Sequence, residues 1–90
     1  MQIPSKFSVR RKQYKVEHRK RMPLMVTGRL YPHSGVLQIG AASTNKPLTF
    51  WHEVTHAILH DMDHPLWDNE AFVTQFSKRL AGVIKSAEFT

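Results

Sequence analysis

The chain has 90 residues, a formal net charge of +6 and no cysteine. This size predicts one small domain covering residues 1–90, and no run of apolar residues approaches the roughly eighteen that a membrane-spanning helix needs. The missing cysteines exclude disulfides and thiolate metal sites, and the first residues lack the apolar stretch of a secretory signal, so we expect a cytoplasmic protein with no membrane partner.

The positive charge is concentrated near the N-terminus. Residues 1–21 hold eight lysines and arginines against one acid, whereas residues 22–90 hold five bases and six acids. The basic residues at 10–15 and 19–21 could therefore attract nucleic acid or an acidic protein. The alternative is that they form the solvated outer sides of strands, because no known nucleic-acid-binding motif accompanies them.

The first half of the chain shows the alternation of apolar and polar residues that is typical of strands. We expect strands at residues 6–10, 14–19, 27–31 and 36–41. The first two strands would be joined by a turn at 11–13, and the last two by a turn at 32–35 that contains Pro32 and Gly35.

The second half predicts two helices. The first should begin near Asn45, a favourable N-cap, and end at about Met62, before Pro65. Its apolar stripe comprises Phe50, Trp51, Val54, Ala57, Ile58 and Met62. The second helix should begin after the N-cap Asp68. Its apolar face comprises Phe72, Val73, Phe76, Leu80, Val83 and Ile84.

This order of elements predicts an α+β fold: a small, mostly antiparallel sheet of three to four strands, followed by two packed helices, with the functional helix first. The connection between the helices, at residues 63–67, is short. The two helices should therefore be neighbours in space.

The first helix contains the motif H-E-x-x-H, formed by His52, Glu53 and His56. Residues four apart lie on one side of a helix, so both imidazoles can reach a single zinc ion. Glu53 can take a proton from a zinc-bound water, as the general base of a metallopeptidase that hydrolyses peptide bonds does. These residues are expected on the more polar flank of the helix, and the alternative is that they are ordinary solvated side chains.

A catalytic zinc ion usually has three protein ligands, so a third is needed. His60 continues the spacing, but it lies roughly 12 Å from His52 along a helix axis, too far to share one ion. Glu70 is preferred, because its spacing from Val73 and Leu80 points it toward the packed side, where an unpaired carboxylate is costly. The other candidates in or beside the connection are Asp61, Asp63, His64 and Asp68. The alternative role for Glu70 is a favourable interaction with the helix dipole.

The segments 50–59 and 68–73, which hold these residues, resemble small gluzincin-type zinc metallopeptidases. They look most like the minigluzincins and the ImmA/IrrE-like peptidases, and residues 28–31 and 35–39 look like the strand pair that precedes the active-site helix there. The resemblance covers most of residues 14–85. It implies His52, His56 and Glu70 as zinc ligands, and Glu53 as the base. It also implies a peptide or protein substrate that pairs with a sheet edge beside the helix.

A different class of function remains open on the sequence. The chain could be a catalytically silent zinc-binding protein whose basic N-terminal segment binds nucleic acid or a host or regulatory protein. A peptidase also needs a group that stabilises the oxyanion. The residues of suitable type are Tyr31, His33, His60 and His64.

Overall fold

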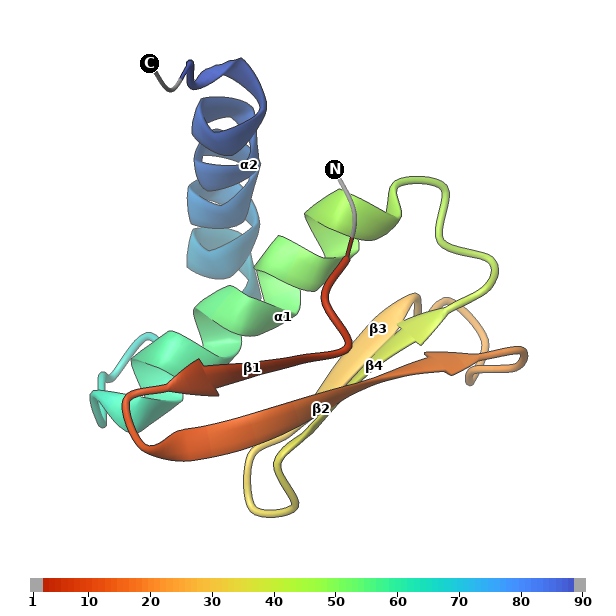
Figure 1. Ribbon diagram of the computed structural model, residues 1–90, viewed down its shortest axis with the longest axis horizontal. Coiled ribbons are helices and arrows are strands. Elements are labelled where there is room, and N and C mark those ends of the chain that lie inside the picture. Colours follow the sequence, from red (N-terminus) through yellow and green to blue (C-terminus); the bar gives the residue numbers. More distant parts are fainter. Residues whose placement is uncertain (1–2, 89–90) are drawn as a thin grey trace.

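The computed structural model describes residues 3–88 as four strands followed by two helices. The elements are β1 (Lys6–Val9), β2 (Lys12–Arg19), β3 (Gly28–Tyr31), β4 (Val36–Gly40), α1 (Lys46–Asp61) and α2 (Glu70–Ser86). Both helices lie on the same side of the sheet (Figure 1). The expected α+β fold, with the strands first and the motif on the first helix, is confirmed.

The strands are ordered β1-β2-β4-β3 across the sheet. The pairs β1–β2 and β3–β4 are antiparallel hairpins, and β2 and β4 are parallel, so the sheet is mixed although most of its pairings are antiparallel. β3 follows β2 in the sequence but does not pair with it, because β4 lies between them. β3 is therefore an edge strand of the sheet. This edge lies beside α1, and that position shapes the candidate site.

The turn between β1 and β2 lies earlier than predicted. Val9 pairs with Lys12, so the turn consists of Arg10 and Arg11, and Arg10 has a φ of 52°. A two-residue hairpin loop can match the right-handed twist of its strands when its first central residue adopts positive φ. β2 therefore begins at Lys12, inside the predicted turn.

The core lies between α1 and the inner face of the sheet. Leu37 and Ile39 of β4 are fully buried, and they pack with Val16 of β2 and with Phe50 and Val54 of α1. The alternation predicted for the strands therefore places their apolar residues on the side that faces α1. Aromatic rings close one end of this core, where Phe7 stacks on Tyr14 with ring centroids 5.1 Å apart.

The predicted boundaries of the helices are close to those observed. The Asn45 side chain caps α1 by accepting a hydrogen bond from the Leu48 amide at 3.2 Å, as expected. The N-cap of α2 is Asn69 rather than Asp68, and its side chain accepts from the Phe72 amide at 2.9 Å. Both residue types are good N-caps, so the residue type alone does not decide between them.

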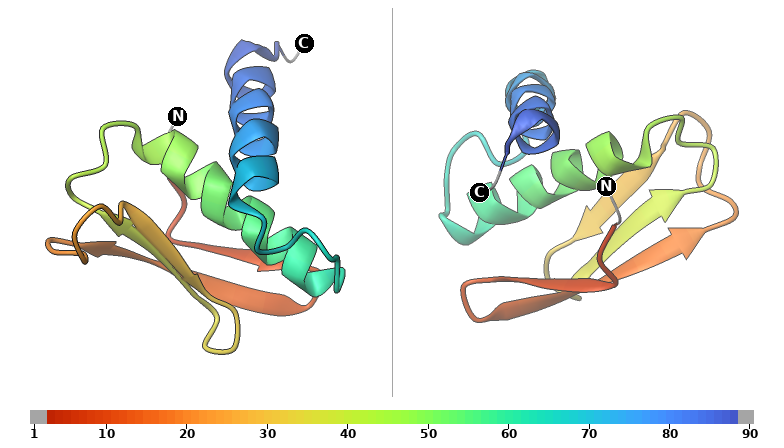
Figure 2. Two further views of the ribbon diagram at one scale, coloured as in Figure 1. Left: turned by 180° about the vertical axis from the view of Figure 1, so that it is seen from behind. Right: turned by 45° about the horizontal axis from the view of Figure 1, so that its top comes forward.

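The predicted apolar faces are only partly buried. Ile58 of α1 is 39% exposed and the C-cap residue Met62 is 60% exposed, and in α2 Phe76 is 48% exposed and Val83 62% exposed. The reason is visible in Figures 1 and 2, where α2 rises from α1 and projects away from the sheet. Within residues 3–88, α2 packs on α1 and on no strand, so only Val73 and Ser77 of this helix are buried.

None of the helices within residues 3–88 combines the length and the hydropathy needed to cross a membrane.

Candidate metal centre

α1 and α2 bring three potential metal ligands together. The rings of His52 and His56 lie side by side on α1, with centroids 5.0 Å apart. Glu70, the first residue of α2, contacts both: its Oε2 lies 3.0 Å from Nε2 of His52, and its Oε1 lies 2.7 Å from Nε2 of His56. One donor atom from each residue lies within 4.8 Å of the other two, so this group could hold a metal ion.

The donor set suits zinc but does not select it over other transition metals. Two imidazole nitrogens and one carboxylate oxygen are ordinary ligands of zinc, and imidazole also suits copper, iron and nickel. The donor atoms of one tetrahedral zinc ion, each about 2.1 Å from the metal, lie about 3.4 Å apart. The donor atoms here lie within 4.8 Å of one another, so modest side-chain movement brings them to that spacing.

The connection between the helices orients His56. Its Nδ1 lies 2.6 Å from the backbone carbonyl oxygen of Trp67, which can only accept, so Nδ1 carries a hydrogen and donates it. In the neutral ring Nε2 is then an acceptor, and it faces the Glu70 carboxylate oxygen at 2.7 Å. Two acceptors at this distance repel each other unless a positive charge lies between them, either a proton or a metal cation. Such a carbonyl partner is typical of metal-binding histidines.

Burial favours the neutral, metal-binding form of His52. Removing this ring from water lowers the pKa of His52, although the neighbouring Glu70 carboxylate acts in the opposite direction. A neutral imidazole is the form that has a free lone pair for a metal ion.

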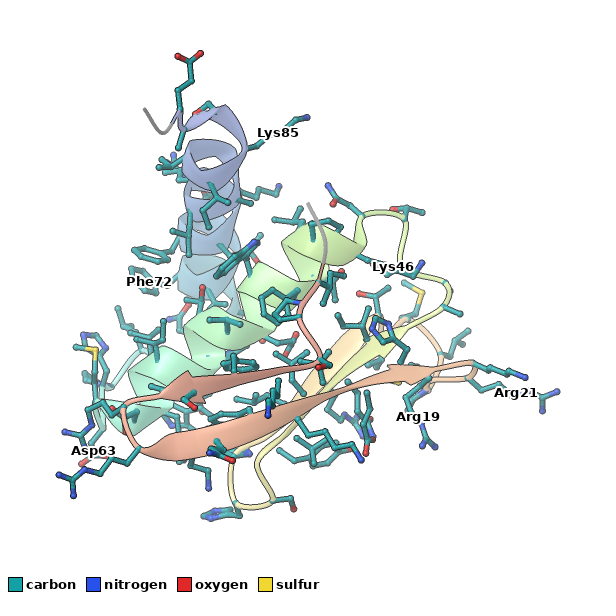
Figure 3. The ribbon with its side chains drawn as sticks, in the orientation of Figure 1. Arg19, Arg21, Lys46, Asp63, Phe72 and Lys85 are labelled. Atoms are coloured by element: carbon teal, nitrogen blue, oxygen red, sulfur yellow. The ribbon has the colours of Figure 1, made fainter. Side chains whose placement is uncertain are left out.

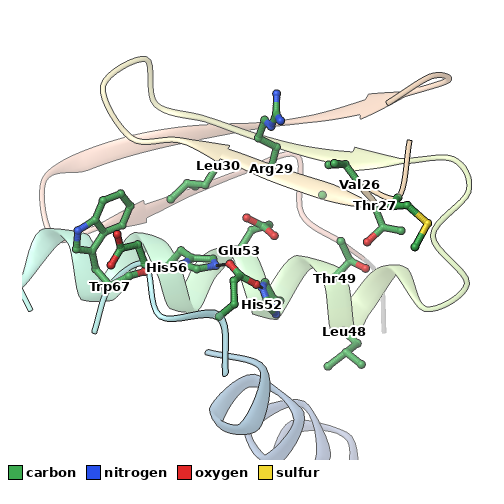
Figure 4. A pocket seen from close by; sticks show the side chains of 14 residues that line it. Val26, Thr27, Arg29, Leu30, Leu48, Thr49, His52, Glu53, His56 and Trp67 are labelled. Atoms are coloured by element: carbon green, nitrogen blue, oxygen red, sulfur yellow. Dashed lines mark hydrogen bonds and ion pairs between the residues drawn. The ribbon is translucent and has the colours of Figure 1, made fainter. Parts of the chain in front are cut away.

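Glu53 lies beside the three ligands but does not belong to the group. It is only 7% exposed, and burial raises the pKa of Glu53 to about 7, with His56 opposing the shift and Glu70 adding to it. Figure 4 shows its carboxylate between α1 and β3, near His52 and His56. A carboxylate whose pKa lies near neutrality is suited to accept and return a proton.

The alternative that these residues are ordinary solvated side chains is wrong for Glu53 and His56. Glu53 and His56 are 7% and 8% exposed, because the edge strand β3 packs against this side of α1. The helical pattern alone shows polar residues there and cannot show that a strand covers them.

The reason given for choosing Glu70 was also wrong, although the residue does meet both histidines. Its side chain is 70% exposed, so the cost of burying an unpaired carboxylate does not determine its position. Glu70 reaches the histidines because Asn69 starts α2 at this point and α2 packs on α1.

The other candidates for a third ligand are placed elsewhere. Asp61 pairs with Arg10 at 3.0 Å, and the ring of His60 meets the Trp67 ring edge-on. The Nδ1 of His64 accepts a hydrogen bond at 3.0 Å from a backbone amide of its own loop. Asp68 lines the pocket that also contains the three ligands, but it does not belong to the ligand group. Asp63, in the same loop, does not belong to that group either.

The three ligands line a groove of about 590 Å³ between α1 and β3. One wall is formed by residues 25–30, and the other by α1 and by the connection that contains Trp67. None of the four candidates for oxyanion stabilisation lines this groove. Tyr31 instead accepts a hydrogen bond from Arg29 at 3.2 Å, and the ring of His33 lies edge-on to that of His60.

Two residues that shape the candidate site, Trp67 and Gly28, were not identified from the sequence. The carbonyl of Trp67 acts through the backbone, so no residue type signals it. Gly28 allows β3 to approach α1, since a Cβ there would lie 2.6 Å from Cγ2 of Thr49. A glycine inside a strand pattern is the signal that could have found it, because such glycines often mark a close approach of the backbone.

No family model, curated protein or solved structure matches this chain.

Proposed function

We propose that this protein is a zinc-dependent metallopeptidase in which His52, His56 and Glu70 bind the metal and Glu53 is the general base. The observation that carries the proposal is the convergence of these four side chains, from two helices, on one open groove. The resemblance of the two helical segments to the gluzincins supports the same set of roles.

A structural zinc site would usually have four protein ligands and no open position. Here three ligands adjoin a groove that is open to solvent, which supports a catalytic role. When bound, zinc supplies Lewis acidity: it polarises the carbonyl of the scissile bond and makes water more acidic.

Glu53 performs the proton transfers in this proposal. Its carboxylate takes a proton from the attacking water and delivers it to the amine that leaves. Burial raises the pKa of Glu53 to about 7, so both protonation states are accessible near neutral pH. Trp67 holds His56 in place through the 2.6 Å contact of its carbonyl, and this limits the reorganisation of the site.

The position of β3 supports a peptide as the substrate. β3 is an edge strand, and residues 25–30 form one wall of the groove that holds the ligands. An extended peptide can add to such an edge by backbone hydrogen bonds, which would place one of its carbonyl groups beside the metal. Met25, Val26 and Leu48 also line the groove and offer apolar contacts to substrate side chains.

The experiment compares wild type with Glu53→Gln, after purification without chelators, for zinc content and for cleavage of a broad peptide library. We expect one zinc ion per chain in both proteins and cleavage by wild type alone. Glu17→Gln is the matched control, because it makes the same chemical change on the outer face of the sheet and should leave cleavage intact. Equal cleavage by wild type and Glu53→Gln contradicts the mechanism, and no cleavage by zinc-loaded wild type favours a silent zinc-binding protein.

A further inference from the structure

The face of the sheet that points away from the helices carries a group of basic side chains. Lys6 of β1, Lys15 and Arg19 of β2 and Arg29 of β3 are exposed. They alternate with residues that point to the core, such as Val16 of β2. We call these four residues the basic face. Because both helices lie on the other side of the sheet, the basic face is open to solvent (Figure 1).

One neighbouring acid offsets only part of this positive charge. Lys6 lies directly opposite Lys15 in the register of β1 and β2, an arrangement in which like charges repel. The one acid on this face within residues 3–88 is Glu17, and its Oε1 accepts a hydrogen bond from Gln38 at 3.2 Å. No member of the basic face forms an ion pair within the described chain.

The basic face covers an area that suits an extended polyanion. Lys15 and Arg19 are four residues apart on one strand, roughly 13 Å, and Arg29 is two strands away from β2, roughly 10 Å. Arg21 continues the charge beyond the end of β2, and Figure 3 shows Arg19 and Arg21 extending away from both helices. The basic face therefore spans several phosphate positions of a nucleic acid strand.

Most of the acidic residues lie on the opposite side of the molecule. Five of the seven acids of the chain belong to α1, to the first residue of α2 or to the connection between them: Glu53, Asp61, Asp63, Asp68 and Glu70. The charge distribution therefore directs a polyanion to the basic face. Arg10, another basic residue near the N-terminus, forms an ion pair with Asp61 at 3.0 Å and is not part of the basic face.

An exposed aromatic ring indicates which polyanion fits. Tyr31 is 38% exposed and stands beside Arg29, whose guanidinium carbon lies 5.9 Å from the centre of the ring. Aromatic rings and guanidinium planes stack on unpaired bases, whereas the bases of a duplex are already stacked. The face belongs to one four-stranded sheet, whereas the major groove of a duplex admits a helix or a two-stranded ribbon.

We propose that the open sheet face binds single-stranded nucleic acid, with Lys6, Lys15, Arg19 and Arg29 contacting phosphates and Tyr31 stacking on a base. This inference is independent of the metal centre, because the two sites lie on opposite sides of the sheet.

The test is a fluorescence anisotropy titration of a short single-stranded oligonucleotide, with the same sequence as a duplex and heparin as competing probes. We expect dissociation constants of roughly micromolar order at low salt, with a log–log salt dependence of about −0.7 per phosphate contact. Lys15→Gln with Arg19→Gln should weaken binding roughly tenfold or more. Lys78→Gln with Lys85→Gln removes the same charge from α2 and should have little effect.

The stacking contact is tested separately. Tyr31→Leu should weaken binding roughly tenfold, whereas Tyr31→Phe, which keeps the ring, should bind as wild type does. Zinc content and thermal stability should be the same in all variants. A loss of oligonucleotide binding then reflects the loss of a contact to the nucleic acid and not misfolding of the variant.

Four results would overturn the inference: no association at low salt, equal losses in the β2 and α2 double variants, tighter binding of the duplex, or equal losses in the two Tyr31 variants. Binding of heparin without binding of the oligonucleotide would also overturn it and would point to an acidic protein as the partner.

Discussion

Gly28 of β3 lies directly against Glu53 of α1. A Cβ at Gly28 would be 3.3 Å from Cγ of Glu53, 3.3 Å from the Gln38 carbonyl oxygen and only 2.6 Å from Cγ2 of Thr49. This close approach lets the edge strand cover Glu53, and burial raises the pKa of that carboxyl to about 7. The spacing between a strand and a helix therefore sets the properties of the proposed base.

Gly28→Ala should destabilise the protein by roughly 1–3 kcal/mol, because the added methyl group must displace β3 or α1. Gly82→Ala is the control: a Cβ there meets nothing within 4 Å, and alanine favours the helix, so we expect a gain of roughly 0.5–1 kcal/mol. Urea unfolding of the three proteins measures both changes. Equal stability of Gly28→Ala and wild type would show that β3 and α1 are further apart than described.

His52→Ala, His56→Ala and Glu70→Ala should each abolish most metal binding, because each removes one of the three proposed ligands. His60→Ala should retain it, since that ring contacts Trp67 and lies outside the ligand group. Elemental analysis after dialysis, together with thermal unfolding, tests this, because metal binding stabilises the folded state. Retention of stoichiometric metal by Glu70→Ala would rule out Glu70 as the third ligand.

The caps of the two helices allow a matched comparison. Asn45→Ala and Asn69→Ala each remove an N-cap hydrogen bond and should each cost roughly 1 kcal/mol of stability. Only Asn69→Ala should also weaken metal binding, because Asn69 precedes Glu70 and positions the first turn of α2. Zinc titration of both variants in competition with a chelator provides the measurement. A similar loss of affinity in both variants would mean that global stability, and not the placement of Glu70, controls binding.

Glu53 should make the stability of the metal-free protein depend on pH. Its pKa is raised from an ordinary 4.5 to about 7 by burial, so the folded state holds this proton more tightly than the unfolded chain does. The resulting stabilisation is complete below about pH 4.5, and it is lost as the pH rises through about 7. Its size is at most roughly 3 kcal/mol.

The histidines titrate in both proteins, so the comparison of wild type with Glu53→Gln measures the effect of Glu53, including its charge interaction with His56. Unfolding of chelator-treated protein between about pH 5 and about pH 8 should show the stability of wild type falling relative to that of the variant as the pH rises. A difference that stays constant over this range would mean that Glu53 has an ordinary pKa.

The local features of this protein follow from its sequence. The alternation of apolar and polar residues predicted the strands, and Asn45 and Pro65 indicated where the first helix begins and ends. The spacing of His52 and His56 predicted that both rings lie on one side of that helix. These properties depend on neighbours within a few residues of each other along the chain, and a single sequence records those neighbours directly.

The surroundings of the site were decided by contacts between distant segments. The sequence does not reveal that β4 lies between β2 and β3, which makes β3 the edge strand that covers Glu53. It also does not reveal that the Trp67 carbonyl holds His56, because every residue has a carbonyl and only the path of the chain selects one. Strand order and backbone contacts of this kind bring together residues far apart in sequence, and the periodicity of a single element carries no information about its partners.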